Sequence, residues 1–137
     1  MKYDYGIIGG GPAGYTFAML QAKQGKKVVI FEKDKIGGTC LNYGCIPTKT
    51  MLHFSEKYKT VLNSKDIGFD VCINNFDFQA IIDKRNNVVE KIRKSLEQSV
   101  KSLGIEIVYA EASVKNKNTI FAQDNEYIAD KIIAETA

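Results

Sequence analysis

The sequence lacks the features that mark several large classes of protein. Only two of its 137 residues are proline and 45% are apolar, which excludes a disordered chain and gives one compact domain enough material for a core. No apolar segment approaches the roughly 20 residues that a membrane-spanning helix needs. The start of the chain has one lysine and then an apolar run broken by glycines, which matches neither a signal peptide nor a transit peptide. We therefore expect a cytoplasmic protein that has no membrane partner.

The chain also has no large excess of charge of either sign, and it has few cysteines. The net charge of +3 comes from 19 basic and 16 acidic residues spread along the chain, and the only arginines are Arg85 and Arg93. Binding of nucleic acid requires a concentrated basic patch, so we expect no nucleic-acid partner. Three cysteines in a chain without an export signal indicate a reducing compartment, where a close cysteine pair is more often catalytic or metal-binding than structural.

Hydrophobic spacing and turn residues predict an α/β fold. Residues 3–10 read as a strand that ends in glycines, 12–25 as a helix and 26–33 as a second strand. These three elements make a β-α-β unit. A second helix is predicted over residues 46–63, and residues 65–77 form a loop or a short extended piece.

A long amphipathic helix is predicted from about Phe78 to Leu103, and Gly104 ends it. Its apolar stripe lasts barely four heptads, so packing against a sheet is favoured over a coiled-coil seam. Strand-like pieces separated by Asn and Asp turns follow as a terminal β-meander, and the last apolar run is Ile132 to Ala134. If that run is a central strand, the next edge of the sheet is left uncovered.

Three glycines, Gly9, Gly11 and Gly14, form a GxGxxG motif between the first strand and the first helix. The first permits a tight turn, the second lets the backbone approach a pyrophosphate, and the third allows close packing of the helix on the strand. The helix N-terminus offers amides and partial positive charge to the phosphates. Glu32 follows about twenty residues later, where a carboxylate can accept hydrogen bonds from ribose hydroxyls. The motif predicts a dinucleotide site but does not separate FAD from NAD, and glycines that serve only a turn are the alternative.

Two cysteines, Cys40 and Cys45, lie five positions apart after a pair of glycines. An ideal helix would hold their α-carbons roughly 8 to 9 Å apart, whereas a disulfide needs less than about 7 Å. A bond between them therefore requires a distorted turn, which Gly44 and Pro47 permit. If a helix runs on from Cys45, Lys49 lies one turn away, and its charge and the helix N-terminus would both favour a thiolate at Cys45.

Zinc binding is the alternative use of these cysteines. The remaining soft ligands are Cys72 and His53, and neither has the paired spacing of a zinc site. We therefore expect no metal site. Cys72 is interpreted as a small apolar packing residue, and His53 as a surface or packing residue rather than a catalytic base.

Taken in order, the strand, GGGPAG, Glu32-Lys33 and the stretch GGTCLNYGCIPTK resemble the N-terminal flavin-binding region of the pyridine nucleotide-disulfide oxidoreductases. Leu41, Ile46 and the Pro47-Thr48-Lys49 run resemble the dihydrolipoamide dehydrogenase branch more than the glutathione or mercuric reductases. Tyr43 stands where the family usually has valine. The resemblance extends over the whole chain, although only the first fifty residues are specific.

The resemblance implies that the glycine motif binds FAD. It makes Cys40 the thiol that exchanges with a dithiol substrate, and Cys45 the charge-transfer thiolate against the isoalloxazine ring. Lys49 would approach the flavin, Glu32 the adenosine ribose, and the backbone around Ala112 the adenine. The implied cofactor-binding residues are Gly9, Gly11, Pro12, Ala13, Gly14, Glu32, Lys33, Gly38, Thr39, Lys49 and Ala112.

The family's chains are several times longer, so the resemblance implies that residues 1–137 are the first segment of an FAD-binding domain. The NAD-binding and dimer-interface domains would be absent, and the family's Ala-Thr-Gly near the end of this region matches Glu135-Thr136-Ala137. The full parent would be a homodimer that uses NAD⁺ to oxidise the dihydrolipoyl group on the acyltransferase subunit of a 2-oxo acid dehydrogenase complex. This chain alone is expected to be inactive. The alternatives are another disulfide reductase of the family and a non-catalytic nucleotide-binding module.

Overall fold

The predicted β-α-β unit opens the fold. In a computed structural model that describes residues 2–135, it comprises β1 (Lys2–Ile8), α1 (Pro12–Lys23) and β2 (Val28–Glu32). Pro12 is the first helical residue of α1, where a missing N–H group leaves no hydrogen bond unmade. The later elements are α2 (Gly38–Asn42), α3 (Cys45–Asn63), the 3₁₀ turn η1 (Ser64–Ile67), α4 (Phe78–Ser102), β3 (Glu106–Tyr109), β4 (Ala112–Asn116), β5 (Thr119–Ala122) and β6 (Asn125–Ala134).

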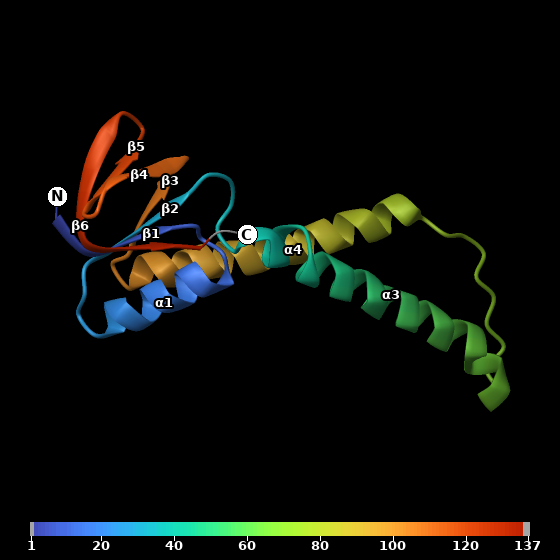
Figure 1. The fold of residues 1–137 in the computed structure, drawn as a ribbon. Coiled ribbons are helices and arrows are strands. Elements are labelled where there is room, and N and C mark those ends of the chain that lie inside the picture. The colour runs from blue at the N-terminus through green and yellow to red at the C-terminus, as the bar shows by residue number, and fades with distance from the viewer. Residues whose placement is uncertain (1, 136–137) are drawn as a thin grey trace.

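One six-stranded sheet joins the two ends of the chain, with the strand order β3-β2-β1-β6-β5-β4 (Figure 1). The strands β3, β2, β1 and β6 are parallel, and β6, β5 and β4 are antiparallel. Parallel strands connected through helices confirm the predicted Rossmann-like α/β fold. The terminal β-meander comprises only β4, β5 and β6, because β3 pairs with β2 at the opposite edge.

The last strand, β6, lies inside the sheet and changes its partner along its length. Its first part, from Asn125 to Ile128, pairs with β5, and the part from Ile128 to Ala134 pairs with β1. Beyond Ile128, no second strand covers the other side of β6 within residues 2–135. The side chain of Asn118 covers the start of this stretch by donating hydrogen bonds to two backbone carbonyls of β6, at 3.0 and 3.1 Å.

The core has two layers because successive side chains of a strand point to opposite faces of the sheet. Val28 and Ile30 of β2 pack with α1 and the end of α4 on one face. Val29 and Phe31 pack with residues of the β-meander on the other. All five residues of β2 are buried, as expected for a parallel strand covered on both faces.

The sheet covers only the second half of the long helix α4. Val100 is fully buried and Leu96 packs beside it under the sheet. The first half runs away from the sheet with α3, and the two helices with their connection form an arm (Figure 1). Phe78, at the start of α4, is 57% exposed, and Ile92, just past its middle, is still 39% exposed. The prediction that the whole apolar stripe packs against a sheet is therefore wrong for the first half.

The start of α4 is fixed by Asp77, whose side chain accepts a hydrogen bond of 3.0 Å from the backbone N–H of Ala80. We expect Asp77→Ala to lower the free energy of unfolding by about 1 kcal/mol, because it removes this N-cap. Urea unfolding followed by circular dichroism measures the change. Asp70→Ala is the matched control, since Asp70 lies in the preceding loop, outside any helix or strand. An equal loss in both variants would contradict a capping role.

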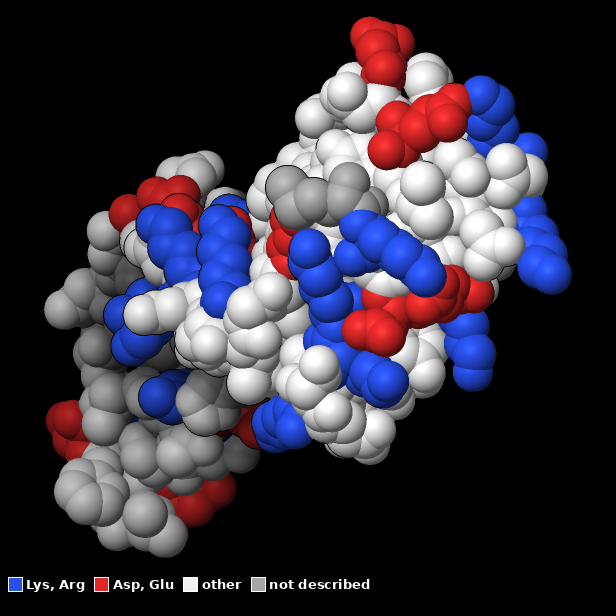
Figure 2. Space-filling view, turned by 90° about the vertical axis from the view of Figure 1, so that its left-hand side faces the viewer, with Lys and Arg blue, Asp and Glu red and all other residues white. Residues whose placement is uncertain are grey.

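Charged side chains of both signs cover the surface. On the face drawn in Figure 2, Lys and Arg side chains are interleaved with Asp and Glu. Among residues 2–135, five ion pairs form on the surface, and they include Lys94 with Glu90 and Lys2 with Asp130. No helix within residues 2–135 has the length and apolar character needed to span a membrane.

Candidate functional site

The glycine loop connects β1 tightly to α1. Gly9 has a φ of +107°, which favours glycine, and its N–H donates to the carbonyl of Phe31 at 2.8 Å. A Cβ atom on Gly14 would lie 2.2 Å from the carbonyl oxygen of Gly9, so only glycine allows this approach. The structure thus gives the first and third glycines the geometric functions that the motif predicts.

Glu32 ends β2 beside the loop and is 9% exposed. Its Oε2 accepts a hydrogen bond from the backbone N–H of Gly10 at 2.8 Å, and its Oε1 accepts one from Asp34 at 2.9 Å. The carboxylate thereby joins the glycine loop to the turn after β2. Each carboxylate oxygen has a second lone pair, so Glu32 can still accept a hydrogen bond from a hydroxyl group.

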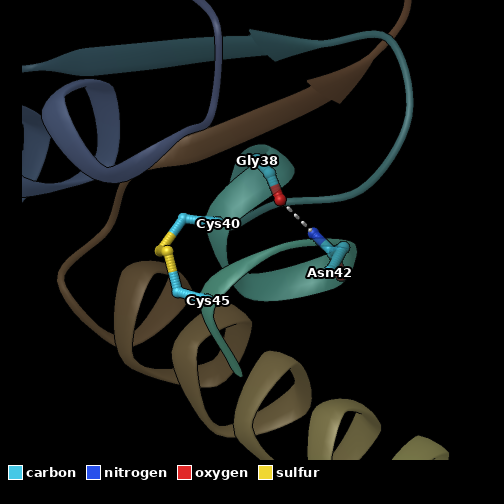
Figure 3. The surroundings of a disulfide bond; sticks show 4 residues. All are labelled: Gly38, Cys40, Asn42 and Cys45. Carbon is cyan, nitrogen blue, oxygen red and sulfur yellow. Dashed lines mark hydrogen bonds between the residues drawn. A yellow bond between two sulfur atoms is a disulfide. The ribbon is translucent and has the colours of Figure 1, made fainter. Parts of the chain in front are cut away.

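Cys40 and Cys45 form a disulfide with their α-carbons 4.7 Å apart. The helix is interrupted between them, because α2 ends at Asn42 and α3 begins at Cys45 (Figure 3). Gly44, which precedes α3, has φ and ψ of −117° and −98°, outside the helical region. This is the distorted turn that the five-residue spacing requires, and it places Cys45 in the first turn of a 19-residue helix.

Asn42 fixes the turn that holds the disulfide. Its Nδ2 donates to the carbonyl of Gly38 at 3.0 Å (Figure 3) and to the carbonyl of Ile36 at 3.1 Å. The Oδ1 atom is buried and has no partner among the described residues. The side chain thus ties the end of the short helix α2 to the start of that helix and to the preceding loop.

A cleft of about 600 Å³ lies between the glycine loop, the end of β2, the start of β4 and the disulfide. It brings together most of the residues implied by the resemblance: Gly9, Gly11, Pro12, Glu32, Lys33, Gly38, Thr39, Cys40 and Ala112. Ala13, Gly14, Cys45 and Lys49 are not in its wall. Cys45 and Lys49 are exposed on the first turns of α3.

Glu135 is a residue of this cleft that the sequence analysis did not select. Its carboxylate accepts hydrogen bonds from the backbone N–H groups of Ala13 and Gly14, at 3.0 and 2.7 Å. These are the amides that a helix N-terminus offers to an anion. The one sequence signal was the departure from Ala-Thr-Gly at this position. Thr136 and Ala137, the rest of that match, lie outside the described residues.

Tyr43, which departs from the family pattern, lies at the rim of the cleft. Its hydroxyl donates to Oδ2 of Asp34 at 2.5 Å, and the ammonium group of Lys35 lies 5.6 Å from the centre of its ring. These contacts join the end of α2 to the loop after β2, on which Lys33 and Asp34 line the cleft. Tyr43 therefore ties the turn that holds the disulfide to the loop that borders the cleft.

Two tyrosines outside the wall of the cleft have strongly raised pKa values. Burial raises the pKa of Tyr109, at the end of β3, to about 12, and the nearby carboxylate of Glu97 adds to the rise. Burial and the Glu106 carboxylate raise the pKa of Tyr3 as well. Both phenols therefore stay protonated at neutral pH and act as structural hydrogen-bond donors.

The other soft ligands lie apart from the disulfide. Cys72 is exposed in the loop before α4, so its interpretation as a packing residue is wrong. His53 is exposed on α3. Within residues 2–135, no three side chains of His, Cys, Asp or Glu come together in a way that could hold a metal ion.

Comparison with known proteins places this geometry in context. The sequence profile of the family described as "Pyridine nucleotide-disulphide oxidoreductase" matches residues 3–134. Dihydrolipoyl dehydrogenase of Acholeplasma laidlawii is 32% identical over 98% of this chain and 40% of its own length. The dihydrolipoyl dehydrogenase of Mycoplasma genitalium is 34% identical over 99% of this chain and 30% of its own length. The chain thus spans well under half the length of these relatives.

A solved structure has the same fold. The HOCl-induced flavoprotein disulfide reductase RclA from Escherichia coli, determined as a Cu(II) complex, superposes on the whole chain with a TM-score of 0.82 and 29% sequence identity. This chain covers 29% of that protein.

Proposed function

Because the chain belongs to the pyridine nucleotide-disulfide oxidoreductase family, we propose that it is the FAD-binding, redox-disulfide part of a dihydrolipoamide dehydrogenase. The observation that carries the proposal is the position of the disulfide, since Cys40 lines the same cleft as the glycine loop. The parent would be a longer chain with NAD-binding and interface domains. It would use NAD⁺ to oxidise the dihydrolipoyl group on the acyltransferase subunit of a 2-oxo acid dehydrogenase complex.

The residues in the wall of the cleft and the adjacent start of α1 fit the adenosine and pyrophosphate of FAD. The amides of Ala13 and Gly14 already bind a carboxylate, which shows that they accept an anion. We assign the pyrophosphate to these amides and to Gly38 and Thr39, and the ribose to Glu32. We likewise propose that Pro12, Lys33, Lys49 and Ala112 contact the cofactor. Bound FAD would supply a two-electron acceptor next to the disulfide.

The disulfide itself performs the substrate chemistry. A thiolate of the dihydrolipoyl group attacks Sγ of Cys40, the Cys40–Cys45 bond breaks, and Cys45 leaves as a thiolate. The second substrate thiol then attacks the mixed disulfide, which releases Cys40 as a thiol and the substrate as a cyclic disulfide. The attacking thiol loses its proton to solvent before the attack, and the proton of the second thiol passes to Cys40. The substrate thus gives up two electrons and two protons, and the cysteine pair is reduced to a thiol and a thiolate. The N-terminus of α3 stabilises negative charge on Cys45, which supports its role as the leaving thiolate.

The arm supports the proposal that the parent is a homodimer. Large apolar side chains are exposed along it, and a monomer seldom leaves so many together in water. They are Leu52, Tyr58, Val61, Leu62, Ile67, Phe69, Ile73, Phe76 and Phe78.

A reducing compartment such as the cytoplasm suits a disulfide that must be reduced in every cycle.

The proposal is tested on the purified chain after mixing with FAD and desalting. We expect retained flavin absorption, a spectral change on adding dihydrolipoamide under nitrogen, and no formation of NADH when NAD⁺ follows. A colourless protein would contradict FAD binding by this segment alone, and robust NADH formation would contradict the inactivity of the segment on its own. Assays of the full-length parent with dihydrolipoamide and with glutathione separate the two reductase alternatives. Flavin binding with inert cysteines would instead favour a non-catalytic nucleotide-binding module.

A further inference from the structure

The amides at the start of α1 bind an anion that belongs to the chain itself. Oε1 of Glu135 accepts from Ala13 N–H at 3.0 Å, and Oε2 accepts from Gly14 N–H at 2.7 Å. The helix has no acidic residue in its first turn and no side-chain cap from its own N-cap residue, Gly11. Glu135 therefore takes the place of the missing cap from 121 residues away along the sequence.

The glycine loop closely surrounds this carboxylate. A Cβ atom on Gly11 would lie 2.7 Å from Oε1 of Glu135, and one on Gly14 would lie 2.7 Å from Oε2. The backbone of Glu135 is also fixed, because its N–H donates to the carbonyl of Ile8 at 2.8 Å. The two hydrogen bonds, the backbone anchor and the close fit together make this a specific contact at the end of β6.

We propose that Glu135 competes with the phosphates of a dinucleotide for the backbone N–H groups of Ala13 and Gly14, which we call the phosphate cradle. The carboxylate of Glu135 must be displaced before a dinucleotide can bind. The inference rests on the proposed function, because the same two amides are assigned to the FAD pyrophosphate. A carboxylate and a phosphate need the same N–H donors and the same partial positive charge of the helix. The two anions also repel each other at close range. Glu135 thus sets the affinity of the cleft for nucleotides.

Nucleotide binding by variants provides the first test. The 137-residue chain, Glu135→Gln and Glu135→Ala are titrated with FAD and with ADP, which carries the pyrophosphate without the flavin. Because the two amides no longer have to give up hydrogen bonds to a charged carboxylate, both variants should bind these nucleotides about 10-fold more tightly. Unchanged or weaker binding in both variants would overturn the proposal.

Glu111→Gln is the matched control for charge. Glu111 is exposed and lines the same cleft, but it makes none of the hydrogen bonds to the start of α1. Removing its charge should change the affinity less than about threefold, because solvent screens an exposed carboxylate. Equal tightening in Glu111→Gln and Glu135→Gln would assign the effect to net charge and overturn the proposal.

Amide hydrogen exchange tests the contact without any ligand. In Glu135→Ala, the amides of Ala13 and Gly14 should exchange at least about 10-fold faster, while the amide of Ala18 in the same helix is unchanged. Unchanged exchange at Ala13 and Gly14 would overturn the inference even if FAD binds, and would leave the proposed function intact. Faster exchange without nucleotide binding by any variant would overturn both the FAD site and the competitor role.

Discussion

Replacing Cys45 with serine is expected to abolish the reduction of bound FAD by dihydrolipoamide, to below the detection limit of an anaerobic spectrum. The variant has no disulfide, so a substrate thiolate has no sulfur–sulfur bond to attack and no route for two electrons. Cys40→Ser should cause the same loss. The measurement is the decrease in flavin absorption after dihydrolipoamide is added under nitrogen.

Cys72→Ser is the matched control because it also removes one sulfur atom. Cys72 is exposed in the loop before α4. Within the described residues, its Sγ makes one hydrogen bond, to the side chain of Asn74. This variant should be reduced at the rate of the unmodified chain. Normal flavin reduction in either disulfide variant would show that the disulfide is not the electron entry point.

The two cysteine variants also test the separate roles of the pair. Cys40→Ser keeps a free thiol at position 45, where the start of α3 favours the thiolate. If Cys45 is the sulfur that interacts with the flavin, FAD-loaded Cys40→Ser should show a long-wavelength band that Cys45→Ser lacks. The reverse pattern would exchange the two roles. It would also agree with the structure's placing of Cys40, rather than Cys45, in the wall of the cleft.

Short-range features of this fold were predictable from the sequence. The β-α-β unit, the start of α1 at Pro12 and the interruption of the helix next to Gly44 agree with the structure, because each depends on neighbouring residues. The family resemblance is confirmed for the same reason, since its specific motifs occupy the first fifty residues. Residues that act through the local backbone are the ones that sequence patterns identify.

Long-range features were not predictable. The apolar stripe of α4 showed that one face is buried or available for packing, but not that its first half leaves the sheet and diverges from α3. The placing of β3 beside β2, far from the β-meander, depends on strand pairing across the whole chain. Glu135 contacts α1 only because β6 lies beside β1, so no local pattern marks it.

Gly14→Ala is expected to lower the free energy of unfolding by about 3 kcal/mol, the upper part of the range for an overpacked site. The new Cβ atom would lie 2.2 Å from the carbonyl oxygen of Gly9, which is a backbone atom and cannot rotate away. Gly9 is itself held by the hydrogen bond from its N–H to Phe31. Relief therefore requires α1 to move away from β1, which disturbs the packing of Ala18 in the core. Urea unfolding measures the loss.

Gly25→Ala separates this clash from the general cost of replacing a glycine. Gly25 follows the same helix with a φ of +79°, and no atom lies within 4 Å of an added Cβ. The control should therefore cost only the strain of a left-handed backbone, about 1–2 kcal/mol, and should bind FAD normally. Gly14→Ala should also lose FAD affinity, because the displaced N–H of residue 14 is one of the two donors to the anion. Equal stability losses in the two variants, with FAD binding unchanged in both, would contradict this prediction. They would show that α1 tolerates the clash and that the distance between α1 and β1 does not determine the affinity of the phosphate cradle for FAD.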